Sequence, residues 1–166
     1  LGTLFETAKQ YGWQNTDVEP VPQREGKPDK PRFGLVTVKD LECKPPEWLI
    51  RDYLEADSMA VAFGDPSSGK SFLGLDAGCC IATGTDFHKE PVKQGPVVYI
   101  AGEGRNGLSR RLKAWSIRHG INLSDSPLFV STGPAAMCDP GSVIEVIQAV
   151  DAFASEPRLV VLDTVA

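Results

Sequence analysis

The sequence predicts an α/β domain with a parallel sheet and helical crossovers. Short apolar runs, of the kind that form buried strands, alternate with amphipathic helical segments from residue 59 to the last residue. A chain of 166 residues has room for one ordinary domain of this class, and two sizeable cores would not fit. Hydrophobic residues make up 42% and charged residues 23%, which excludes a disordered or collagen-like chain.

The chain divides into three parts by composition. Residues 1–15 are predicted to hold a short amphipathic helix, because Leu4, Phe5, Ala8 and Tyr11 recur at helical spacing. Residues 16–32 are rich in proline and poor in apolar residues, as in a linker. Residues 33–166 form the predicted α/β domain, the core part of the chain.

Within the core, Trp48–Leu54 is an amphipathic entry segment, and strands and helices then alternate. The predicted strands are Met59–Phe63, Pro96–Ala101, Leu128–Ser131 and Arg158–Asp163, and the predicted helices are Lys70–Ala82, Leu108–His119 and Ser142–Ala154. This order is typical of repeated strand–helix–strand units with parallel strands.

A phosphate-binding loop lies between the first predicted strand and the first helix. The sequence from Gly64 to Ser71 fits G-x-x-x-x-G-K-[ST] without deviation. Glycines let the backbone curl so that amide groups point inward, and the helix that follows directs its positive end at the same place. Lys70 is expected to reach the outer phosphates of ATP, and the Ser71 hydroxyl to bind Mg²⁺. The predicted nucleotide-binding residues are Gly64, Asp65, Pro66, Ser67, Ser68, Gly69, Lys70, Ser71 and Phe72.

Two acidic residues follow other strands of the predicted sheet. Asp163 ends the last apolar strand, a pattern that holds Mg²⁺ in P-loop enzymes, so we predict a magnesium site from Ser71 and Asp163. Thr164 follows Asp163, whereas many motor ATPases carry a water-activating glutamate there. We therefore predict that Glu103, just past the carboxyl end of another strand, activates the attacking water, with Lys70 as the second catalytic residue.

The sequence also contains a second glycine-rich motif, which predicts a different ligand. Residues 102–107 satisfy G-x-G-x-x-G, the pattern of dinucleotide-binding folds. Such folds need an acidic residue at the end of the next strand, where this chain has Ser131, Thr132 and Gly133. The alternative of dinucleotide binding is therefore weak.

Charge and cysteine content restrict the partners and the cellular compartment that we expect for the domain. The net charge of −5 disfavours wholesale binding of a nucleic-acid backbone. A basic cluster on residues 105–118 is interpreted first as a solvated helix face, with a subunit or nucleic-acid contact as the alternative. Four cysteines lack metal-binding spacing, and Cys79 and Cys80 are expected to be small core residues. Free thiols favour a cytoplasmic protein, and no apolar run is long enough to span a membrane.

Several stretches together resemble one family. The lead-in at Trp48, the P-loop, the run from Gln94 to Gly104, the helix around Trp115 and the end at Val161–Thr164 are similar to RecA-like ATPases of the RepA hexameric helicase type, a group of AAA-family ATPases common in phages and mobile elements. The resemblance covers residues 48–166. It implies ATP and Mg²⁺ as cofactors, a catalytic Glu103, a metal-site Asp163 and a hexameric ring in DNA replication. Residues 1–15 are similar to the tail of primase-associated modules.

Members of that family continue past the Asp-Thr pair. They add a central strand, loops that bind single-stranded DNA, and basic residues that reach the neighbouring subunit's nucleotide. By this resemblance we expect an N-terminal part of a larger protein, with a RecA-like sheet that stops after the magnesium-binding strand. Since an arginine supplied in trans is worth roughly 10³–10⁵ in rate, we expect these 166 residues alone to bind ATP weakly and hydrolyse it barely.

Two other functions stay open. One is an ATP-gated, DNA-associated loader that binds nucleotide and a partner without processive work. The other is a P-loop kinase for a small molecule, which would need an acceptor-binding lid. Only the residues after Thr132 offer space for that lid, and they are apolar and helical.

Overall fold

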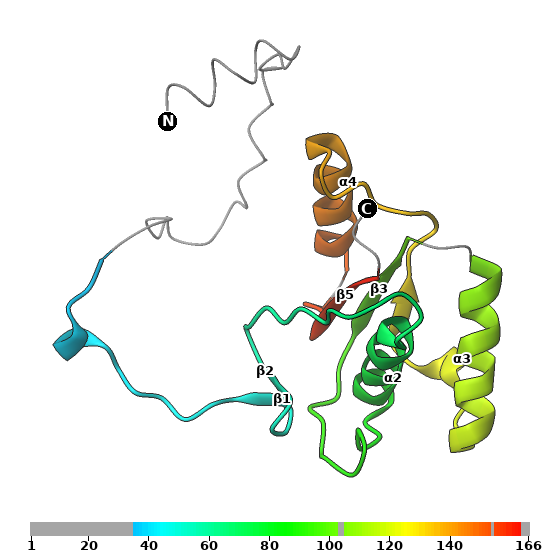
Figure 1. Cartoon of the computed structure of the whole chain (residues 1–166), viewed down its shortest axis with the longest axis horizontal. Coiled ribbons are helices and arrows are strands. Elements are labelled where there is room, and N and C mark those ends of the chain that lie inside the picture. The colour runs from blue at the N-terminus through cyan, green and yellow to red at the C-terminus, as the bar shows by residue number, and fades with distance from the viewer. Residues whose placement is uncertain (1–34, 103–104, 154, 164–166) are drawn as a thin grey trace. The chain divides into compact units, whose positions relative to one another are not determined.

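The computed structural model describes residues 35–102, 105–153 and 155–163 (Figure 1). It divides into two compact units, residues 1–40 and 41–166. The described part of the first unit holds one 3₁₀ turn, η1 (Val38–Asp40), whose residues are all exposed. The predicted helix at 1–15 and linker at 16–32 lie outside the described residues.

A three-stranded parallel sheet organises the second unit. β3 (Val97–Ala101) lies between β4 (Leu128–Val130) and β5 (Leu159–Asp163). All five residues of β3 are buried, as expected of a continuous apolar run in a central strand. These three strands confirm the predicted parallel sheet, and each begins and ends within one residue of its predicted bounds.

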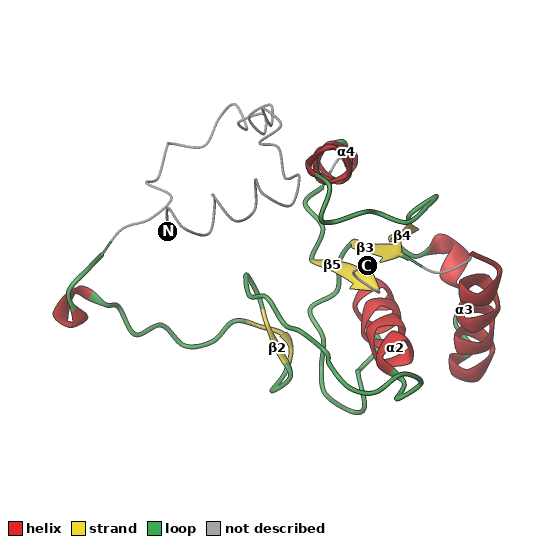
Figure 2. Ribbon diagram, turned by 45° about the horizontal axis from the view of Figure 1, so that its top comes forward, coloured by secondary structure: helices red, strands yellow, loops and turns green. Residues whose placement is uncertain are grey.

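Three helices cover the sheet. Figure 2 shows α2 (Lys70–Thr83) and α3 (Arg105–His119) on one side of the strands and α4 (Pro140–Asp151) on the other. The sequence explains their ends. The Asp139 carboxylate accepts a hydrogen bond from the Ser142 amide at 2.8 Å and caps α4, while Gly84 ends α2 in the left-handed conformation. The three predicted helices are confirmed, with small shifts at their ends.

The core lies between α2, α3 and the sheet. Its most buried side chains are Tyr99, Ile81, Val97, Cys79 and Cys80. Burial raises the pKa of both thiols to about 12, so these cysteines stay protonated at neutral pH and act as small core residues. That prediction is confirmed.

A short hairpin precedes the P-loop. β1 (Trp48–Ile50) pairs antiparallel with β2 (Leu54–Glu55), and Leu49 and Ile50 are buried in the core cluster. A 3₁₀ turn, η2 (Leu123–Asp125), connects α3 to β4. Among the residues that the structure describes, no helix has the length and apolarity to cross a membrane.

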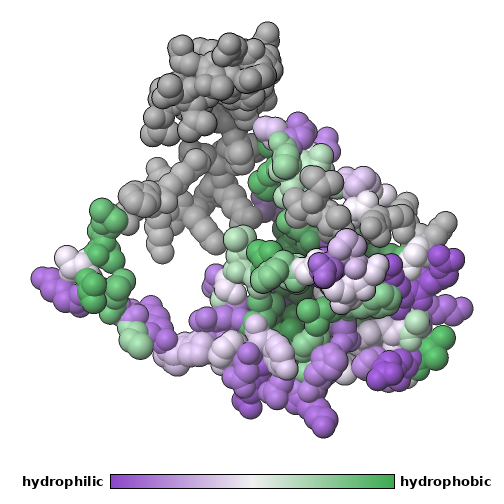
Figure 3. Space-filling view, in the orientation of Figure 1, coloured by the Kyte–Doolittle hydropathy of each residue, from purple (hydrophilic) through white to green (hydrophobic). Residues whose placement is uncertain are grey.

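The predicted strand at Met59–Phe63 is wrong. This segment forms no strand and pairs with no described strand, and Met59, Val61 and Phe63 are 90%, 72% and 91% exposed. Hydrophobic residues are visible on the surface in Figure 3. The physical reason is pairing: an apolar run becomes a strand only when a neighbour satisfies its amides and carbonyls. β5 pairs with β3 on one edge, and no described strand lies on its other edge.

Candidate nucleotide and magnesium site

The backbone of the P-loop is built for a sharp entry into α2. Gly69 is the N-cap residue of this helix, with a φ of 94° that a residue with a side chain would rarely adopt. Its carbonyl accepts the first helical hydrogen bond, from the Leu73 amide at 3.0 Å. Ser67 also has a positive φ, of 65°. Pro66, Ser67 and Ser68 form the exposed crest of the loop.

Lys70 folds its side chain over this loop. Its Nζ donates hydrogen bonds to the carbonyl oxygens of Gly64 and Asp65, at 2.9 and 2.8 Å. The first turn of α2 contains no acidic residue that would compete for its free amide groups. A helix N-terminus with an adjacent ammonium group attracts an anion, because both the helix dipole and the lysine are positive there.

Two residues far apart in the chain meet beside the loop. The Ser71 hydroxyl donates to Oδ1 of Asp163 at 2.8 Å, across 92 positions in the sequence. Ser71 lies in the first turn of α2, and Asp163 is the last residue of β5. The structure thus brings together the two residues predicted to bind magnesium. Both are partly buried.

The second oxygen of Asp163 is held from the sheet itself. The Tyr99 hydroxyl donates to Oδ2 of Asp163 at 2.6 Å and lies 3.4 Å from the Ser71 carbonyl oxygen. Burial and the hydrogen bond to Asp163 raise the pKa of the Tyr99 phenol far above its usual value, so the hydroxyl keeps its proton and remains a donor. Each carboxylate oxygen of Asp163 therefore accepts a bond from a different hydroxyl.

These groups fit the chemistry of Mg²⁺. Hydroxyl and carboxylate oxygens are hard donors, and Mg²⁺ usually takes one or two carboxylates, with waters and phosphates filling its other positions. Within the described ranges, no group of three or more His, Cys, Asp or Glu side chains could hold a metal ion. Ser71 and Asp163, next to an anion-binding helix end, are instead suited to a magnesium ion that arrives with a nucleotide.

Two other predicted site residues are Glu103 and Phe72. Glu103 lies outside the described residues. Gly102, the residue before it, donates from its amide to the Asp163 carbonyl oxygen at 2.9 Å. The Phe72 ring lies under the guanidinium of Arg111, 4.9 Å from its centroid, and lines a groove between α2 and α3. Any contact of Phe72 with nucleotide would therefore come from its backbone.

The groove between α2 and α3 has a volume of about 750 Å³. Basic residues on its rim give it a positive character, and apolar side chains of Leu75 and Trp115 form part of its wall. The basic residues are Lys89, Arg110, Arg111 and Arg118. Leu108 and Trp115 are buried and lie on the inner face of α3.

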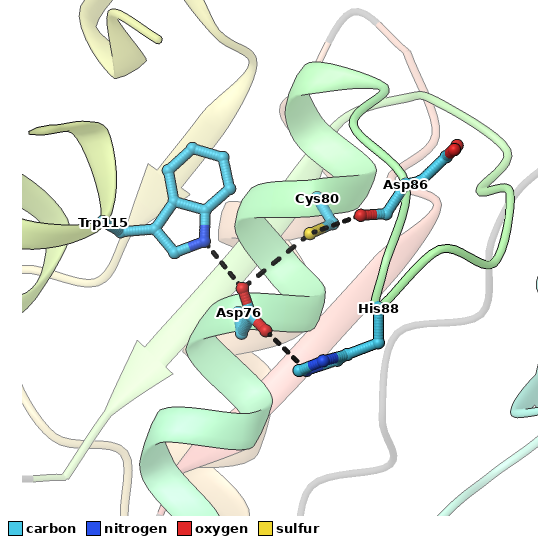
Figure 4. A network of polar contacts seen from close by, with 5 residues as sticks. All are labelled: Asp76, Cys80, Asp86, His88 and Trp115. Carbon is cyan, nitrogen blue, oxygen red and sulfur yellow. Dashed lines mark hydrogen bonds and ion pairs between the residues drawn. The ribbon is translucent and has the colours of Figure 1, made fainter. Parts of the chain in front are cut away.

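Asp76 is the centre of a polar network in this groove (Figure 4). Its Oδ1 accepts a hydrogen bond from Nε1 of Trp115 at 2.7 Å and lies 3.8 Å from the Cys80 thiol. Its Oδ2 lies 3.1 Å from Nε2 of His88, which ties the 86–89 loop to α2. The Trp115 ring also stacks on His119, with centroids 4.1 Å apart.

Replacing Asp76 should therefore destabilise the fold without touching the P-loop. In Asp76→Ala the buried Trp115 N–H loses its acceptor, and an unsatisfied buried donor costs about 1–3 kcal/mol. We expect urea denaturation to show a loss of this size in the free energy of unfolding. The matched control is Asp86→Ala, whose exposed side chain lines the same groove and which should change stability by less than about 0.5 kcal/mol.

Sequence reasoning missed Tyr99 and Asp76. The signal for Tyr99 was present: a hydroxyl in the apolar run from Val97 to Ala101 must find a partner when the strand is buried. Asp76 gave a similar signal, an acidic residue inside an apolar helix. In both cases the sequence indicates that a partner exists but not which residue it is.

Comparison with known proteins gives one match. A family model described as an AAA domain matches residues 27–166, most of the chain. No curated protein and no solved structure matches it significantly.

Proposed function

The chain belongs to the AAA domain family of P-loop ATPases, and from this membership we propose that it binds ATP with Mg²⁺ and hydrolyses the nucleotide to drive a DNA helicase or replication motor. ATP binding and hydrolysis are what the family indicates. The three-stranded parallel sheet with helices on both faces is consistent with a RecA-like P-loop NTPase fold. The helicase role and the DNA link are the finer part of the proposal.

One observation carries the proposal: the contact between Ser71 and Asp163 at the N-terminus of α2. A P-loop motif alone predicts phosphate binding. An acidic residue from a distant strand, within hydrogen-bonding distance of the P-loop serine, adds the second half of a magnesium site. The contact therefore favours a nucleoside triphosphate with its metal ion, rather than a simple anion, as the ligand of this site.

In this proposal each residue has a separate task. Backbone N–H groups of residues 64–71, apart from Pro66, which has none, would bind the phosphates together with the Lys70 ammonium, while Ser71 and Asp163 would hold the Mg²⁺. When bound there, the ion would neutralise charge that develops on the phosphate oxygens. Glu103, as the general base, would accept a proton from the attacking water.

The finer proposal rests on the resemblance to RepA-type helicases. It expects a homo-oligomeric ring, hexameric by analogy, and contact with single-stranded DNA. The basic residues of α3 are our candidates for a contact with a neighbouring subunit or with nucleic acid. An ATP-gated loader is the main alternative, and a small-molecule kinase is a weaker one.

The motor proposal is tested by measuring ATP turnover by the full-length protein with and without single-stranded DNA. Strong stimulation by DNA supports a motor. Hydrolysis that DNA does not change favours the loader, and transfer of the γ-phosphate to a small acceptor would identify a kinase. Absence of any ATP binding would contradict the proposal as a whole.

A further inference from the structure

We infer that Tyr99 is a positioning residue for the magnesium site: its hydroxyl fixes the orientation of the Asp163 carboxylate. The inference rests on the proposed function, because it concerns the same nucleotide site. It adds a residue that neither the P-loop motif nor the family match assigns.

Strand register brings Tyr99 to Asp163. In the pairing of β3 with β5, Tyr99 lies opposite Val161 and Ala101 lies opposite Asp163. Tyr99 and Asp163 are therefore diagonal neighbours on one face of the sheet, a separation that a long aromatic side chain can bridge. The same face meets α2, since the Tyr99 hydroxyl also lies 3.4 Å from the Ser71 carbonyl oxygen.

The hydrogen bond is set by rigid surroundings. Tyr99 is 1% exposed, and it comes from the central strand, which pairs on both sides. Its ring therefore cannot swing away without opening the core. The 2.6 Å distance from the hydroxyl to Oδ2 is short, as is usual for a bond to a charged acceptor.

The two hydroxyls that donate to Asp163 come from different structural elements. Ser71 is part of the P-loop helix and is itself predicted to bind the metal, whereas Tyr99 belongs to the sheet and has no other role in the proposed chemistry. A partner bonded behind a metal ligand sets the ligand's orientation, and losing such a partner typically costs about 10–100-fold in metal affinity. Tyr99 matches that description.

The test replaces only the hydroxyl. In Tyr99→Phe, binding of a fluorescent ATP analogue is titrated at fixed nucleotide with increasing Mg²⁺, and again in EDTA. We expect about 10-fold more Mg²⁺ to be needed for half-saturation, with metal-free nucleotide binding unchanged. The matched control is Tyr53→Phe, which removes a hydroxyl from a 64% exposed ring that packs on Phe87.

A double-mutant cycle with Asp163→Asn separates positioning from folding. If Tyr99 acts through Asp163, the Phe substitution should change the Mg²⁺ requirement little once the carboxylate is gone. An equal effect in both backgrounds, or a Tyr99→Phe protein that no longer folds at 25 °C, would assign the hydroxyl a structural role and overturn the inference.

The outcomes also separate this inference from the proposed function. If the wild-type protein shows Mg²⁺-dependent nucleotide binding and Tyr99→Phe behaves identically, the inference alone is wrong. If the wild type binds no nucleotide better than Lys70→Ala does, the proposed function fails, and the positioning role fails with it.

Discussion

Replacing Lys70 with alanine is expected to weaken ATP binding by roughly 10–100-fold. The substitution removes the ammonium whose Nζ lies over the P-loop, bonded to the carbonyl oxygens of Gly64 and Asp65. A hydrogen bond to a charged group is worth about 1.5–3 kcal/mol, and each 1.4 kcal/mol is tenfold in affinity. Isothermal titration with ATP and excess Mg²⁺ measures the change.

The fold should survive this substitution. Lys70 is only partly buried, and its loss leaves the packing of α2 against the sheet intact. The matched control is Lys113→Ala, which removes the same charge from an exposed position on α3. Unchanged ATP affinity in Lys70→Ala would mean that the phosphates bind elsewhere. Equal losses in the two variants would mean that Lys70 contributes only through net charge.

The elements of the fold that could be predicted are those whose own local sequence determines their secondary structure. The three strands of the sheet are short apolar runs, and α4 carries both a capping Asp139 and an N-terminal proline, Pro140. The exception shows what pattern leaves out. The segment from Met59 to Phe63 is as apolar as the others, but it has no partner strand among the described residues, and pairing depends on the rest of the sheet.

Sequence motifs indicated which residues of the candidate site come together, but not the contacts that support them. Motif spacing predicted Ser71 and Asp163, because each follows a recognisable chemical pattern, and the structure places them in contact. The bond from Tyr99 to Asp163 depends on the register between β3 and β5, which no local pattern specifies. The network at Asp76 depends likewise on how α3 packs against α2. Supporting contacts belong to the tertiary structure, so they emerge only when it is known.

Changing Glu103 to glutamine is expected to abolish turnover while leaving ATP binding nearly unchanged. Glutamine keeps the size of the side chain but cannot accept a proton from water. Loss of a general base typically lowers the rate by about 10²–10⁴-fold. In the protein as its gene encodes it, phosphate release under saturating ATP measures turnover, and an equilibrium titration measures binding, which should stay within about threefold.

The position of Glu103 in the chain supports this expectation. The residue before it, Gly102, bonds through its amide to the Asp163 carbonyl, so the end of β3 is tied to the strand that carries the predicted magnesium ligand. Glu145→Gln is the matched control: it makes the same change on exposed α4 and should keep full turnover. Normal hydrolysis by Glu103→Gln would place the base elsewhere. Since Thr164 offers no carboxylate next to Asp163, that result would require a base from another part of the protein or from a neighbouring subunit.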